Sequence, residues 1–115
     1  MQVYGIKNCN TVKKALTWLE EKNIPYTFHD FKKEGVTDSK LKEWEKVLGW
    51  ERLLNKRGTT WRKISPEIQA TIVDGPSARK LMMENTSIIK RPVVETPDGL
   101  LLGFDESEYS ERLSE

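Results

Sequence analysis

At the start of the chain, a strand-forming segment is followed by a helix-forming segment and then by a second strand-forming segment. This order restricts the fold more than any other feature of the sequence. Residues 3–6 are a short apolar run that predicts a buried strand. A helix is expected next, because apolar residues recur at the spacing of one helical face: Val12, Ala15, Leu16 and Leu19. Asn23 and Pro25 are typical of a helix end, and residues 25–30 carry β-formers at alternating positions. The sequence therefore predicts a β-α-β unit.

The middle of the chain has the pattern of several helices. Apolar residues mark one helix that ends at Gly49 and a short helical turn after it: Leu41, Trp44, Val47 and Leu48, then Trp50, Leu53 and Leu54. Ser65 followed by Pro66 is typical of a helix start and predicts a third helix, while residues 75–76 begin a fourth.

The end of the chain predicts a hairpin and a last helix. Two short apolar runs, 93–96 and 100–103, flank a Pro-Asp-Gly turn. Asp105 and Glu108 have the spacing of a capping box. Without the middle helices, this is the βαβ–ββα order of a thioredoxin-like core. We therefore predict a single α/β domain over 1–115, with its core at 1–35 and 86–115 and an all-helical insert at 36–85, between the second and third strands.

Composition limits the chemistry and the compartment. The 115 residues include one cysteine and one histidine, which excludes an internal disulfide and argues against a metal site. The 19 Lys and Arg residues nearly balance 18 Asp and Glu residues, which argues against a nucleic-acid partner. The first residues are unlike a signal peptide, and the longest apolar run, 100–104, is too short for a membrane span. We expect a cytoplasmic monomer with no membrane association.

Cys9 lies where the first predicted helix begins. Unpaired N–H groups at a helix N-terminus stabilise a thiolate, and nearby lysines add positive charge, so we expect a lowered pKa for Cys9. The alternative is an inert, buried cysteine at the end of a strand. Val12 stands three residues later, where a Cys-x-x-Cys pair would have its second thiol. Any thiol cycle therefore needs an external thiol.

Four segments, taken in order, resemble one known family. They are YGIKNC (4–9), LLNKRGT (53–59), IKRPVV (89–94) and LLGF (101–104). Together they are similar to the arsenate reductase family of the glutaredoxin-linked type, which also contains the Spx-type transcription regulators. The tract at 53–62 looks most like a branch of uncharacterised bacterial arsenate-reductase-like proteins that are suggested to be glutathione-dependent thiol reductases.

The resemblance implies a fold and a site. The fold would be thioredoxin-like with a helical insert, and Cys9 would be the nucleophile. Arg91 and Pro92 would form the family's Arg-Pro step, with Pro92 cis beside the cysteine; the alternative for Arg91 is a solvated arginine at a strand entry. Glutathione would be the co-substrate. The predicted substrate- or glutathione-binding set is Asn8, Asn10, Thr11, Arg57, Trp61, Arg91 and Pro92.

Departures from the family pattern bear on the substrate. Arsenate reductases of this type surround the cysteine with three arginines, of which Arg91 matches one. Asn55 and Gly103 stand where the others are expected, although Arg57 lies close by. An oxyanion needs several charged donors, so we expect weak or no arsenate reduction. Spx-type regulators usually carry Cys-x-x-Cys as a redox switch, which is missing here, but binding to RNA polymerase stays an alternative.

The stretch 55–63 is basic and contains an aromatic residue. It holds Lys56, Arg57, Arg62 and Lys63 without an acidic residue, and it includes Trp61. Three interpretations remain open: a patch that binds the carboxylates of glutathione, a nucleic-acid surface, or a solvated loop whose tryptophan is half-buried.

The sequence as a whole predicts a glutathione-dependent thiol/disulfide oxidoreductase with a single catalytic thiol. The Cys9 thiolate would attack a small oxidised substrate or a protein disulfide, and glutathione would resolve the mixed disulfide. The alternatives are a non-enzymatic Spx-type regulator that binds RNA polymerase and an arsenate reductase of weak or no activity.

Overall fold

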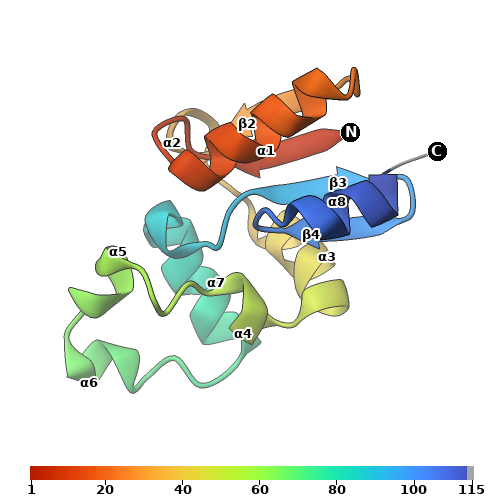
Figure 1. Cartoon of the computed structure of the whole chain (residues 1–115). Coiled ribbons are helices and arrows are strands. Elements are labelled where there is room, and N and C mark those ends of the chain that lie inside the picture. Colours follow the sequence, from red (N-terminus) through yellow and green to blue (C-terminus); the bar gives the residue numbers. More distant parts are fainter. Residues whose placement is uncertain (114–115) are drawn as a thin grey trace. The chain divides into compact units, whose positions relative to one another are not determined.

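The computed structural model describes residues 1–113. The chain divides into two compact units. The first, called the core unit below, comprises Met1–Glu34 and Arg91–Glu115. The second, the insert unit, is Gly35–Lys90. Figure 1 shows the helices and strands of both units along the chain.

The core unit contains a four-stranded mixed sheet. Its elements are β1 (Gln2–Gly5), α1 (Asn10–Glu21), β2 (Thr27–Asp30), α2 (Phe31–Glu34), β3 (Val93–Thr96), β4 (Gly99–Leu102) and α8 (Glu106–Leu113). The strand order is β2-β1-β3-β4. β1 runs parallel to β2 and antiparallel to β3, which pairs with β4 as a hairpin. The predicted βαβ–ββα order is confirmed, and the fold is thioredoxin-like with a helical insert.

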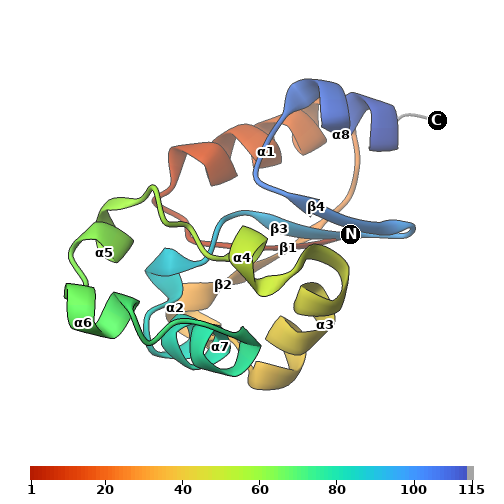
Figure 2. The same cartoon turned by 90° about the horizontal axis from the view of Figure 1, so that it is seen from below.

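One face of this sheet carries the main apolar cluster. Helices α1 and α8 lie on the same side of the strands (Figure 2). The cluster joins both helices to three adjacent strands through Val3, Ala15, Trp18, Leu19, Val94, Leu101 and Tyr109. The register explains this grouping, because Val94 pairs with Val3 on one side and with Leu101 on the other. Side chains paired across adjacent strands point to the same face.

Helix α1 ends where the sequence predicts. Asn23 has a φ of 57°, the left-handed conformation expected after a helix, and the N–H of Ile24 donates to the Leu19 carbonyl at 2.9 Å. The short α2 was not predicted.

The regular secondary structure of the insert unit is helical, as predicted, apart from one isolated β-bridge between Leu54 and Ile89. Its elements are α3 (Asp38–Leu48), α4 (Trp50–Leu53), α5 (Thr59–Arg62), α6 (Pro66–Gln69), α7 (Gly75–Glu84) and the 3₁₀ helix η1 (Thr86–Ile88). Arg79 of α7 is buried and joins α7 to α3 through ion pairs with Asp38 at 2.8 Å and Glu45 at 2.6 Å. One expectation is wrong: Val47, placed on the apolar face of α3, is 63% exposed.

Within residues 1–113, no helix combines the length and the apolar character that a bilayer span requires.

Candidate functional site

Cys9 is the N-cap residue of α1. Its backbone is extended, with φ −132° and ψ 121°, and its carbonyl accepts the hydrogen bond from the N–H of Lys13 at 3.0 Å. The side chain is partly exposed. The thiol therefore stands beside the first turn of the helix, where backbone N–H groups lack partners within the helix.

The surroundings of Cys9 favour the thiolate. Partial burial by itself raises the pKa of the thiol, but hydrogen bonding from the Val12 N–H, the side chain and charge of Arg91, and the Thr11 N–H outweigh it. The net effect lowers the pKa of Cys9 below its ordinary value. A lower pKa increases the fraction of the nucleophilic form at neutral pH.

A close approach between β1 and α1 positions this first turn. A Cβ atom on Gly5 would lie 2.9 Å from Cγ2 of Val12, a buried residue in the first turn of α1. Because Gly5 has no side chain, Val12 can pack directly on the end of β1. Its N–H is then held next to the Cys9 sulfur.

Arg91 reaches Cys9 from the segment that enters β3. The Arg91–Pro92 peptide bond is cis, as the resemblance implies. The Pro92 carbonyl accepts a hydrogen bond from the Gly103 N–H at 2.8 Å, and the Gly103 carbonyl accepts one from the Tyr109 hydroxyl at 2.6 Å. Gly103 has a φ of 76°, which favours glycine. Helix α8 is thus connected to the segment that carries Arg91 by two hydrogen bonds that the sequence did not predict.

The other predicted site residues fall into two groups. Asn8, Asn10 and Thr11 are exposed and flank Cys9 in the chain. Arg57 and Trp61 belong to the insert unit, so their proximity to Cys9 stays a prediction.

In the basic stretch of the insert unit, the Lys56 side chain contacts two tryptophan rings. Nζ of Lys56 lies 5.9 Å from the ring centroid of Trp50 and 5.7 Å from that of Trp61. These are cation–π distances. Trp61 is half-buried in α5, a helical turn that was not predicted from the sequence.

The single histidine has a structural environment. Nε2 of His29 lies 2.6 Å from Oε1 of Gln2, Nδ1 lies 3.2 Å from Oε1 of Glu34, and the ring stacks on Tyr4 with centroids 4.4 Å apart. These contacts orient His29 in the sheet. Among residues 1–113, His, Cys, Asp and Glu side chains form no group of three that could hold a metal ion.

The fold and the thiol define a class of protein. A thioredoxin-like sheet places one cysteine at the N-terminus of its first helix, and a helical insert separates the two halves of the core. A model of the ArsC family matches residues 4–112, and the chain belongs to this family.

Curated relatives agree with this assignment. The chain is 43% identical over 107 residues to an uncharacterised protein of Haemophilus influenzae, covering 93% of both proteins. It is 26% identical over 103 residues to the global transcriptional regulator Spx of Staphylococcus saprophyticus, covering 88% of this chain and 77% of the regulator.

Solved structures have the same fold. The YFFB protein superposes with a TM-score of 0.93 at 41% identity, covering 98% of each chain. An arsenate reductase-related protein of Brucella melitensis gives a TM-score of 0.76 at 46% identity, covering 99% of this chain and 94% of the other.

Proposed function

We propose that this protein is a glutathione-dependent thiol/disulfide oxidoreductase in which Cys9 is the catalytic nucleophile. The observation that carries the proposal is the position of Cys9 at the N-cap of α1, where hydrogen bonding from the first turn of the helix and from Arg91 lowers the pKa of the thiol. Membership in the ArsC family supports a thiol-based reaction. The chain has no second cysteine, so the resolving thiol has to come from another molecule.

The reaction is an exchange of disulfide bonds. The Cys9 thiolate attacks the glutathione sulfur of a mixed disulfide between glutathione and a substrate thiol. A bond between Cys9 and glutathione forms as the original disulfide breaks, and the substrate leaves as a thiolate that takes up a proton. The thiolate of a second glutathione then attacks the adduct. Oxidised glutathione is released and the Cys9 thiolate is restored. The net reaction converts the mixed disulfide and one added glutathione into the substrate thiol and oxidised glutathione.

The backbone N–H groups of α1 and the side chain of Arg91 would stabilise the negative charge on Cys9 during this cycle. The N–H groups of Val12 and Thr11 and the guanidinium of Arg91 stabilise the Cys9 thiolate before attack and again when it leaves the adduct. The predicted contacts of Asn8, Asn10, Thr11, Pro92, Arg57 and Trp61 with glutathione are part of the same proposal. Arg57 and Trp61 would supply the charge and the aromatic wall for its carboxylates and backbone.

The test is turnover of the mixed disulfide of cysteine and glutathione, with oxidised glutathione measured through glutathione reductase and NADPH. We expect turnover by the parent protein and background rates for Cys9→Ser. Arsenate is the second substrate in the same assay, and its expected rate is negligible. Equal rates for parent and Cys9→Ser on both substrates would contradict the proposal.

A second candidate function is binding to RNA polymerase without catalysis. The observation that favours it is the 26% identity to an Spx regulator. A pull-down with purified RNA polymerase separates the two functions. Retention of polymerase by both the parent and Cys9→Ser, without glutathione-linked turnover in the parent, would favour the regulator.

A further inference from the structure

The core unit contains a pocket at the end of the sheet remote from Cys9. Its volume is about 780 Å³, within the range of small-molecule sites. Met1 lines it at the start of β1, whereas Cys9 follows the other end of that strand. The remaining lining residues come from the end of α1 and the segment after it, the β3–β4 turn and α8: Trp18, Lys22, Asn23, Ile24, Pro25, Pro97, Asp98, Ser110, Arg112 and Leu113.

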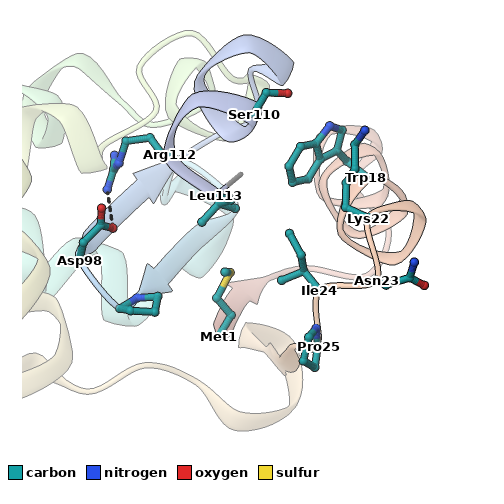
Figure 3. Close-up of a pocket in the computed structure, with 11 residues that line it drawn as sticks. Met1, Trp18, Lys22, Asn23, Ile24, Pro25, Asp98, Ser110, Arg112 and Leu113 are labelled. Carbon is teal, nitrogen blue, oxygen red and sulfur yellow. Dashed lines mark ion pairs between the residues drawn. The ribbon is translucent and has the colours of Figure 1, made fainter. Parts of the chain in front are cut away.

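The walls of this pocket suit a flat apolar body. In Figure 3, the Trp18 ring lies on one side, with Met1, Ile24 and Leu113 below and opposite it. Trp18 cannot easily turn away, because it is 7% exposed and packs edge-on against Tyr109 with centroids 5.6 Å apart. Tryptophan and methionine both make favourable contacts with planar rings.

The charges of the pocket suit a single negative group. Lys22 and Arg112 line it from opposite sides, Lys22 directly after α1 and Arg112 on α8 (Figure 3). The carboxylate of Asp98 lies 3.5 Å from the Arg112 guanidinium, and the Arg112 side chain also donates to the Leu100 carbonyl at 3.2 Å. Two cations against one carboxylate leave one positive charge without a counter-charge among the lining side chains.

We propose that this pocket binds a small planar monocarboxylate, with its ring against Trp18 and its carboxylate between Lys22 and Arg112. The site is separate from the thiol site and does not depend on the proposed oxidoreductase function. The carboxylate gains charge-assisted hydrogen bonds, and the ring is removed from water by the apolar wall.

The test follows the indole signal of Trp18 and the amide signals of Lys22, Ile24 and Asp98 by ¹H–¹⁵N NMR. The probe is naphthalene-2-acetate. The controls are 2-naphthaleneethanol, which keeps the ring without the charge, and acetate, which keeps the charge without the ring. We expect saturable shifts for the probe and weaker binding, by at least about threefold, for each control.

Charge variants test whether positive side chains in the pocket strengthen probe binding and whether the negative side chain weakens it. Lys22→Gln and Arg112→Gln should each weaken probe binding at least about threefold, since each removes one attractive charge. Asp98→Asn should strengthen it, because a repulsive charge is removed while the amide oxygen can still accept from Thr96. Lys33→Gln, an exposed cation of α2, is the matched control and should leave binding unchanged.

Two results would overturn the proposal. One is equal affinity for the naphthalene carboxylate and the neutral alcohol, which would show that charge plays no part. The other is probe binding whose shifts miss the pocket residues, or whose affinity is the same in Lys22→Gln, Arg112→Gln and Asp98→Asn.

Discussion

At the scale of single residues, the thiolate form of Cys9 is favoured by a cation that lies far away in the sequence. Arg91 both donates a hydrogen bond to Cys9 and places a positive charge next to it. Arg91→Gln should raise the pKa of Cys9 and slow its alkylation at neutral pH. The measurement is the rate of iodoacetamide modification between pH 5 and 10, followed by mass spectrometry.

The matched control for Arg91→Gln is Lys90→Gln, which removes an exposed charge from the neighbouring position. It should leave the pH profile of the parent unchanged. In the parent, the midpoint of the profile should lie below the ordinary value of a free cysteine thiol, because the surroundings of Cys9 lower its pKa. A profile that is the same in all three proteins would contradict the role of Arg91.

Tyr109 is connected to the segment that carries Arg91 through its hydrogen bond to Gly103. Its hydroxyl is buried and donates to the Gly103 carbonyl, which would lose its partner in Tyr109→Phe. We expect the free energy of unfolding to fall by about 1–2 kcal/mol. Urea unfolding followed by circular dichroism measures this change.

Tyr26→Phe is the comparison for Tyr109→Phe, since the Tyr26 hydroxyl donates to Glu20 at 2.8 Å in an exposed position. Water can replace that bond, so the expected loss is below about 0.5 kcal/mol. Equal losses in the two variants would mean that burial of the Gly103 bond is unimportant.

At the scale of elements, the approach of α1 to β1 connects packing to chemistry. Gly5→Ala would place a methyl group against Val12, which is fully buried and cannot move without disturbing the first turn of α1. Overpacking of this kind costs about 1–3 kcal/mol. Because the Val12 N–H favours the Cys9 thiolate, the same change should raise the pKa of Cys9.

Two measurements check Gly5→Ala: urea unfolding and the alkylation profile of Cys9. Thr17→Ala is the control, because it lies on the exposed side of α1. Gly5→Ala with normal stability and a normal profile would show that the close approach is not required for the site.

The sequence predicted the elements that have a repeating pattern. The apolar spacing from Val12 to Leu19 and the signals at Asn23 and Pro25 predicted α1 with both of its ends. Helices α2 and α5 contain four residues each, too few for a helical period to show.

Contacts between residues that lie far apart in the chain could not be predicted from local sequence patterns. The contact of Arg91 with Cys9 was expected only through a family resemblance, because no local pattern brings these positions together. The Tyr109–Gly103 bond and the burial of Trp18 against Tyr109 depend on how α8 packs, which periodicity does not reveal.

At the scale of the whole molecule, the core unit presents two chemically different regions at opposite ends of β1. The strand spans Gln2–Gly5, about 13 Å at about 3.3 Å per residue. Cys9 follows one end, and the pocket around Met1 opens at the other. A ligand in the pocket therefore leaves the thiol accessible, and α1 is the element that both regions share.

Each unit also contains a carboxyl group that is stabilised in its ionised form. In the insert unit, the hydrogen bond from Arg79 lowers the pKa of Asp38 below its usual value. In the core unit, the Thr96 hydroxyl does the same for Asp98. A lowered pKa in the folded state means that the ionised group contributes stability above the unfolded value, near 3.9, and that this contribution is lost as the pH falls through the folded value.

The midpoint of thermal unfolding should therefore decrease between pH 6 and pH 3. Arg79→Met removes the partner of Asp38, so it should lower the midpoint at pH 6 and decrease less on acidification than the parent. Lys80→Met, an exposed position on the same helix, should follow the parent at every pH. Circular dichroism melts at pH 6, 4 and 3 measure the three proteins side by side. An equal decrease in Arg79→Met and the parent would show that the ion pair of Asp38 with Arg79 does not contribute to the acid sensitivity of the fold.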